Sequence, residues 1–286
     1  MEWQRVAELH GGGENGRHGS GYLLSPGLAL TARHVVERLD SIELRLLEPD
    51  QLGFPGAAGI WQPARVAWTS STADLAMLAP QVGSSTFRAL DSATTLARVG
   101  GRAPIRVHSL GFPRALLTAT HSDTLQLEAA VNPWSGVRSD SLLLDVRTTR
   151  PADDEGWKGM SGAAVFAGDR LVGVIEAVPT RLDSSTLRAT AAFALFDDLQ
   201  AAEMLRAAGV ERASEHVDAS YVDRLPSSGS WGGTQEHYAR AVVATFCSID
   251  FMGFAVHGAM EGRTPALAAF TERRMRCWPD EPSSVR

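Results

Sequence analysis

Cysteine is almost absent from this sequence. Only Cys247 and Cys277 occur among the 286 residues, and both lie close to the C-terminus. Two thiols exclude a disulfide framework and also exclude a cysteine-rich zinc site. Such scarcity suits a protein of a reducing compartment.

Long apolar runs are missing as well. No stretch approaches the ~18 consecutive apolar residues of a membrane-spanning helix, and the apolar passage over residues 190–195 is far too short. The N-terminus carries no basic start followed by an apolar run and a small-residue cleavage site. We therefore expect no secretory signal, no membrane association and a cytoplasmic location.

Positive charge is not in excess either. The formal net charge is −6, with 27 Lys and Arg against 33 Asp and Glu. A general electrostatic attraction to nucleic acid or to an anionic membrane is therefore not expected. Hydrophobic residues make up 44% and charged residues 21%, which is the mix of an ordinary globular protein.

Short apolar or alternating runs, separated by Gly, Pro, Asp and Ser, fill the chain from Val6 to Leu195. Runs of four to eight residues at such close spacing predict many β-strands in a sandwich or a barrel. Strands do not alternate with helical segments, and no glycine-rich loop lies between a strand and a helix. Both observations argue against a nucleotide-binding α/β fold.

The composition changes after Phe196. Residues 197–208 are rich in Ala and Leu and end at Gly209, which predicts a helix. The segment LPSSGSWGG, residues 225–233, is typical of a linker, and helical composition follows it. We expect a main domain over residues 1–210, a linker over 211–233 and a small helical appendage over 234–286, a possible interaction module.

Three short segments carry the residues of a nucleophilic site. They are TARHVV with His34, ADLAML with Asp74, and GMSGAAVF with Ser161. Each segment alone is typical of a turn or a strand end. The order His, Asp, Ser along the chain, however, is the triad order of two-barrel proteases and differs from that of α/β-hydrolases.

The chemistry explains why these residue types belong together. A Ser161 hydroxyl needs the His34 imidazole to take its proton, and the Asp74 carboxylate would orient that imidazole. The flanking glycines would let the N–H groups of Gly159 and Ser161 converge on an oxyanion. The sequence indicates no metal and no organic cofactor.

The segments GSGYLLSPGLALTARHVV, STADLAMLAP, LGFP and GMSGAAVF resemble the motifs of trypsin- and chymotrypsin-like serine proteases, over about residues 5–200. The segments VNPWSGVRSDSLLLDV and GWKGMSGAAVFAGDRLVGVI further resemble bacterial trypsin-like domains of multi-domain signalling and defence proteins. The resemblance implies a mainly β fold of two antiparallel six-stranded barrels with the small helical appendage. It also implies a serine endopeptidase, acting as a regulated intracellular effector on polypeptide substrates.

The resemblance extends to two further positions. Glu155, six residues before Ser161, falls where the family places the base of its specificity pocket, which implies a preference for Arg or Lys before the cut bond. Met160 stands where trypsins activated by cleavage carry an Asp, so activation through a new N-terminus is not expected.

Two other functions compete with this hypothesis. The first is a protease-like module that binds a partner peptide without cleaving it. The second is a regulated effector whose C-terminal segment, residues 226–286, docks a protein partner that triggers cleavage.

Overall fold

The computed structural model describes residues 2–12, 17–49, 55–81, 93–118, 122–136, 139–148, 150–177 and 185–224, which all belong to one compact unit. Every structural statement below concerns these residues. The expected appendage over 234–286 lies outside them, as does the last part of the expected linker.

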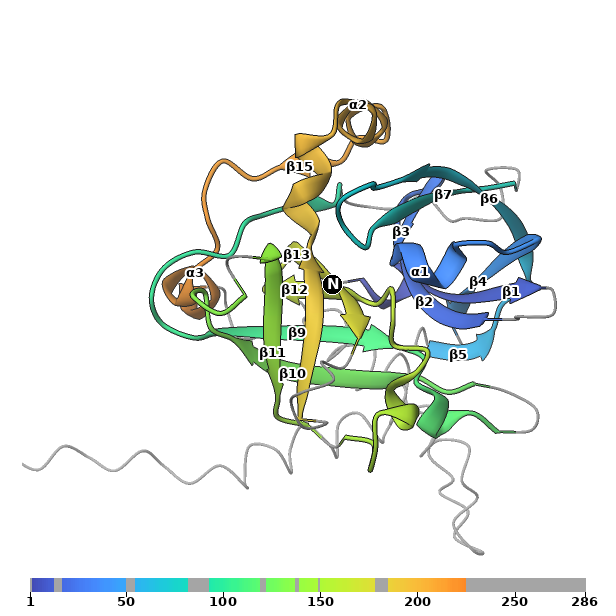
Figure 1. Cartoon of the computed structure of the whole chain (residues 1–286), viewed down its shortest axis with the longest axis horizontal. Helices are drawn as coiled ribbons and strands as arrows, with labels where there is room; N and C mark the ends of the chain where they lie inside the picture. The colour runs from blue at the N-terminus through green and yellow to red at the C-terminus, as the bar shows by residue number, and fades with distance from the viewer. Residues whose placement is uncertain are drawn as a thin grey trace, which may run out of the picture. The chain divides into compact units, whose positions relative to one another are not determined.

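The first barrel closes through six antiparallel strands (Figure 1). Its strands follow the order β1-β2-β3-β7-β6-β4, and β4 pairs back with β1. Strand β5 (Pro55–Ala58) adds to β4 outside the ring. The six barrel strands are β1 (Val6–Gly12), β2 (Arg17–Ser25), β3 (Leu28–Thr31), β4 (Ser41–Pro49), β6 (Gln62–Thr69) and β7 (Ala76–Pro80).

The second barrel closes in the same way, in the order β12-β9-β10-β11-β14-β13, with β13 pairing back to β12. Two short strands, β8 (Thr95–Leu96) and β15 (Glu211–Arg212), extend β13 in parallel. The six barrel strands are β9 (Ile105–Gly111), β10 (Leu125–Val131), β11 (Ser141–Val146), β12 (Ala164–Ala167), β13 (Arg170–Ala177) and β14 (Thr186–Ala191). The expected fold of two six-stranded antiparallel barrels is confirmed.

Helices are few and short in the part of the chain that the structure describes. They are α1 (Arg33–Val36), α2 (Leu199–Ala207), α3 (Ala219–Arg224) and the 3₁₀ turns η1 (Trp3–Arg5), η2 (Arg114–Leu116), η4 (Glu155–Trp157) and η5 (Ala192–Asp197). Helix α2 confirms the helix expected after Phe196, and the Asp198 carboxylate caps it by accepting the Ala201 N–H at 2.9 Å. None of these helices is long and apolar enough to span a membrane.

Residues 211–224 pack on the second barrel. Strand β15 pairs with β8, the Val217 side chain is buried in the apolar core of this barrel, and α3 contacts β9. The folded unit therefore includes the first part of the segment that the sequence assigns to a linker.

The two barrels meet along buried contacts. The rings of Tyr22 in β2 and Phe166 in β12 pack edge to face at a centroid distance of 5.1 Å. Gly162, just before β12, approaches β2 so closely that a Cβ on it would lie 1.9 Å from the Ser20 carbonyl oxygen. Only glycine fits there, because the approaching atom belongs to the backbone and cannot rotate away.

This approach yields a stability prediction with an internal control. Gly162 (φ +92°) and Gly209 (φ +71°) both have a left-handed backbone, but no atom lies within 4 Å of a Cβ on Gly209. We expect Gly209→Ala to lower the free energy of unfolding by about 1–2 kcal/mol, through backbone strain alone. Gly162→Ala should add a steric cost of about 1–3 kcal/mol or more.

Thermal denaturation of the two variants provides the measurement. For a domain of this size, 1 kcal/mol corresponds to a melting shift of about 2–4 °C. Equal melting temperatures for Gly162→Ala and Gly209→Ala would contradict the close contact with Ser20.

Candidate active site

The sheet register of the first barrel brings two of the three candidate residues together. Strands β3 and β7 are paired so that Thr31 lies opposite Ala76. His34 follows Thr31 in helix α1, and Asp74 precedes Ala76 by two residues. Both side chains therefore lie at the same end of this strand pair.

His34 and Asp74 are joined by two hydrogen bonds. The His34 ring nitrogen Nδ1 lies 2.6 Å from Asp74 Oδ2, and the His34 backbone N–H donates to Asp74 Oδ1 at 2.9 Å. A carboxylate only accepts, so Nδ1 carries the proton and Nε2 keeps its lone pair. The imidazole is 44% exposed while the carboxylate is 13% exposed, so a substrate can reach His34.

A compact turn presents Asp74. The Ser70 hydroxyl accepts the Ala73 N–H at 3.0 Å, and the Ser70 N–H donates to the Leu75 carbonyl at 3.0 Å. The Arg33 guanidinium donates to the Ser70 carbonyl at 2.7 Å, which ties the turn to α1. Both candidate residues are thus held by the backbone around them as well as by each other.

The electrostatics keep Asp74 ionised. Burial by itself raises the pKa of this carboxyl, but the hydrogen bonds from His34 and the positive charge of Arg33 outweigh burial and lower the pKa below its ordinary value of 3.8. Asp74 is therefore a carboxylate throughout the neutral range, where it can stabilise a protonated imidazole.

Ser161 lies in a loop that is fastened to the first barrel. The Ser161 carbonyl accepts the Ser20 N–H at 2.8 Å. The buried Ser20 hydroxyl donates to the Gly159 carbonyl at 2.7 Å and accepts the Phe112 N–H at 3.0 Å. The loop of the second barrel is therefore positioned by β2, a strand of the barrel that carries His34 and Asp74.

The Ser161 hydroxyl has a different partner from the one that a triad requires. It donates to the Glu176 backbone carbonyl at 2.9 Å. Within the described part of the chain, no hydrogen bond joins Ser161 to His34. The structure thus pairs His34 with Asp74 and leaves the serine hydroxyl turned toward β13.

Gly159 has the conformation of a tight backbone turn. Its φ is +94°, and a Cβ would lie 2.2 Å from the Phe112 carbonyl oxygen. Among the residues that the structure describes, no acceptor receives the N–H of Gly159 or the N–H of Ser161. Two backbone donors of one short loop are therefore free.

Glu155 lies on the surface in η4. Its side chain is 62% exposed, and its carboxylate pairs with Lys158 at 2.8 Å and with Arg114 at 3.6 Å. The neighbouring Asp153 carboxylate accepts the Gly156 N–H at 2.9 Å. The acidic run before Ser161 therefore forms an exposed turn whose charges are partly compensated.

Met160 is 1% exposed and packs in the apolar core of the second barrel. No metal-binding group of three or more His, Cys, Asp and Glu side chains occurs within the described ranges.

Several residues around the loop of Ser161 have no signal in the sequence. One is Glu176, whose side chain binds Arg188 through two contacts at 2.9 and 2.5 Å. Another is Glu8, which is 3% exposed and contacts His18 at 2.7 Å and Arg45 at 2.5 Å. These residues come from strands far apart in the chain, so only the folded barrels reveal them.

The contacts of Glu8 with its neighbours shift the pKa of its carboxyl. Burial raises its pKa, but the hydrogen bonds with His18 and Arg45 dominate and lower the pKa to about 2. The His18 ring also borders the loop, since its Nδ1 would lie 2.9 Å from a Cβ on Gly159. The hydrogen bond between His18 and the buried Glu8 therefore supports this side of the loop.

Comparison with known solved structures finds bacterial proteases. The Yersinia pestis serine endoprotease is 16% identical, with a TM-score of 0.48 over 71% of this chain and 64% of that one, so the chain spans less than two thirds of it. The active form of the Rv3671c protease from M. tuberculosis is 16% identical, with a TM-score of 0.49 over 76% of this chain and 85% of that one. The MamO protease domain from Magnetospirillum magneticum is 20% identical, with a TM-score of 0.48 over 68% of this chain and 95% of that one.

Sequence comparison identifies the family. No curated protein matches the chain. The family model described as the trypsin-like peptidase domain matches residues 19–174, more than half of the 286 residues, and the match includes His34, Asp74 and Ser161. The chain therefore belongs to the family of trypsin-like peptidase domains.

Proposed function

We propose that the protein cleaves peptide bonds through an acyl-enzyme, with Ser161 as nucleophile, His34 as general base and then general acid, and Asp74 as the group that orients His34. The observation that carries the proposal is the 2.6 Å contact between His34 Nδ1 and Asp74 Oδ2. This contact fixes the tautomer whose Nε2 can accept a proton, as nucleophilic catalysis by serine requires.

In this mechanism, Ser161 Oγ attacks the substrate carbonyl carbon while its proton moves to His34 Nε2. The carbonyl oxygen becomes an oxyanion, and the N–H groups of Gly159 and Ser161 stabilise it. Their lack of an acceptor among the described residues supports this role. His34 then protonates the leaving amine, and water hydrolyses the acyl-enzyme by the reverse sequence.

The Ser161 hydroxyl has to leave the Glu176 carbonyl before it can attack. The exchange gives up one neutral hydrogen bond, a net cost of about 1 kcal/mol. The described conformation thus corresponds to a resting state, and a bound substrate could displace the hydroxyl by hydrogen-bonding to the Glu176 carbonyl itself. The substrate would lie as an extended strand against a sheet edge.

The alternative function is a module that binds peptides without cleaving them. The hydrogen bond between Ser161 and Glu176 favours it, because the serine is not activated there. The ionised Asp74, whose side chain is 13% exposed, argues for catalysis, since binding alone gives no reason to hold a carboxylate against an exposed imidazole. Regulation by a protein partner through residues 226–286 and a cytoplasmic location remain predictions from the sequence.

The first prediction concerns the nucleophile. We expect Ser161→Ala and His34→Ala each to lower kcat for a peptide substrate by a factor on the order of 10⁶, and the double variant to lose no more than either, because the two residues act as a unit. A fluorophosphonate probe should label the wild-type protein and not Ser161→Ala. Replacing the exposed His10 of β1 by alanine is the control and should leave kcat unchanged.

Full turnover by Ser161→Ala would contradict the assignment of the nucleophile. A folded wild-type protein that neither reacts with the probe nor cleaves peptides, but binds them, would establish the non-catalytic alternative.

The second prediction concerns pH. An imidazole base is neutral above about pH 6.5, so the rate of hydrolysis should rise between about pH 5 and pH 8. Asp74 stays ionised over this range because its pKa is lowered. A rate that is constant from pH 5 to pH 8 would argue against general-base catalysis.

The Asp74 carboxylate should make the stability of the fold depend on pH. A lowered pKa in the folded state means that Asp74 stabilises the fold above its ordinary value of 3.8, and that this contribution is lost as the pH falls through the lowered value. Urea unfolding at pH 7 and pH 3 should therefore show a larger loss for the wild type than for Asp74→Asn.

A further prediction concerns the substrate residue before the cut bond. If Glu155 recognises that residue, peptides with Arg or Lys there should be cleaved best, and Glu155→Gln should reduce the preference. Lys158 competes for the same carboxylate at 2.8 Å, so Lys158→Ala should strengthen the preference. Kinetics with peptides that differ only at this residue provide the measurement. A preference for Leu, Phe or Ala that Glu155→Gln leaves unchanged would overturn this specificity and leave the triad untouched.

A further inference from the structure

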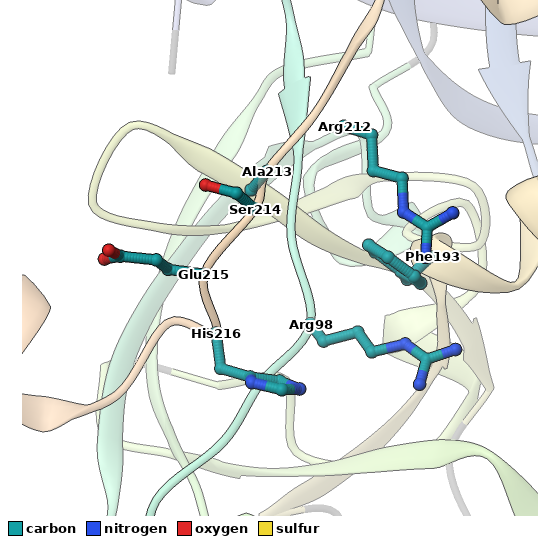
Figure 2. Close-up of a pocket in the computed structure, with 7 residues that line it drawn as sticks. All are labelled: Arg98, Phe193, Arg212, Ala213, Ser214, Glu215 and His216. Carbon is teal, nitrogen blue, oxygen red and sulfur yellow. The ribbon is translucent and has the colours of Figure 1, made fainter.

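A cavity lies on the second barrel, between η5 and the segment that follows β15 (Figure 2). Its volume is about 290 Å³. None of the candidate catalytic residues lines this cavity. The residues that line it are Arg98, Phe193, Arg212, Ala213, Ser214, Glu215 and His216.

Backbone hydrogen bonds fix the walls of this cavity. The Ala213 N–H donates to the Leu96 carbonyl at 2.8 Å, and the Val217 N–H donates to the Arg98 carbonyl at 2.8 Å. The Gly100 N–H donates to the Val217 carbonyl at 2.9 Å. The cavity is therefore preformed, because the segment on either side of it is paired with the chain around β8.

Two guanidinium groups are ordered by one aromatic ring. The guanidinium carbon of Arg98 lies 4.4 Å from the centroid of the Phe193 ring, and that of Arg212 lies 4.6 Å from it. Figure 2 shows the two side chains reaching this ring from above and from below. A guanidinium that stacks on a ring keeps its N–H groups in its own plane, where they remain available to a ligand.

These positive charges are poorly compensated. Arg212 forms no ion pair with any residue that the structure describes. Arg98 reaches Asp197 only at 3.9 Å, with both side chains more than half exposed. The Glu215 carboxylate, although it lines the cavity, points away from both guanidinium groups in Figure 2. The cavity therefore presents an excess of cationic hydrogen-bond donors.

We propose that this cavity binds a small molecule with two oxyanion groups, one held by Arg98 and the other by Arg212. Planar guanidinium groups match the oxygen spacing of phosphates and carboxylates, and each charge-assisted contact is stronger than a neutral one. The His216 ring lines the same cavity on the side of Arg98, whereas the Ser214 hydroxyl points away from both guanidinium groups in Figure 2. The inference is independent of the proposed peptidase activity.

The geometry favours a ligand with two oxyanions. Both guanidinium carbons lie within 4.6 Å of one centroid, so they are at most about 9 Å apart. Figure 2 shows the Phe193 ring between the two guanidinium groups in that view, so a ligand with one oxyanion for each group would bridge the ring. The volume lies close to the lower end of small-molecule sites, which fits a short linear dianion better than a macromolecular segment.

Calorimetric titration of the full chain at low salt tests the proposal. The probes are tripolyphosphate and adipate, whose terminal groups are phosphates and carboxylates respectively, with inorganic phosphate and acetate as single-group controls. We expect one or both long probes to bind at least tenfold more tightly than the matching single group. The better of the two long probes identifies the oxyanion.

Substitutions locate the binding. Arg98→Gln and Arg212→Gln should each weaken binding of the better probe at least about tenfold. Arg98→Lys should also weaken it, since lysine keeps the charge but loses the fork. Arg65→Gln, at an exposed position of β6, removes one positive charge from the first barrel and should leave binding of the probe unchanged. The proposal is overturned if neither long probe binds at millimolar concentration, or if Arg98→Gln and Arg212→Gln bind it as the wild type does.

Discussion

The buried hydroxyl of Ser20 is the contact on which the site depends. It donates to the Gly159 carbonyl and accepts the Phe112 N–H, while the Ser20 backbone N–H donates to the Ser161 carbonyl. One residue of the first barrel thus fixes two carbonyls of a loop that belongs to the second. Buried polar groups must be satisfied, so these bonds impose a single arrangement of the loop. This arrangement of the loop requires glycine at positions 159 and 162, because no Cβ fits between the loop and its neighbours.

Each barrel supplies part of the candidate active site. The first barrel holds a histidine and a carboxylate in one geometry, through paired strand ends and a hydrogen-bonded turn. The second barrel holds the serine in a loop with free backbone donors. No disulfide is needed to join them in the described part of the chain, since apolar contacts such as that of Tyr22 with Phe166 bury the interface. In the proposed mechanism, activity depends on the relative position of the barrels, which is a packing property.

The segment after β14 builds the cationic cavity. Its turn η5 supplies Phe193, and the chain returns after α2 to run beside β8. The cationic cavity forms only because that returning strand pairs with the second barrel. Residues 211–224 are therefore part of the folded unit and carry a charged surface that is separate from the candidate active site.

Local sequence patterns determined the mainly β class and the short helix α2, and they marked His34, Asp74 and Ser161 as candidate site residues. Short alternating runs specify strands, and a histidine, an aspartate and a serine at strand ends are visible without a structure. Tertiary structure alone decided which groups touch. The partnership of Glu8 with His18, the hydrogen bond from Ser161 to Glu176 and the stacking of Arg98 and Arg212 on Phe193 join residues that are separated by up to 95 positions. No spacing rule relates such residues, because strand order and barrel closure bring them together.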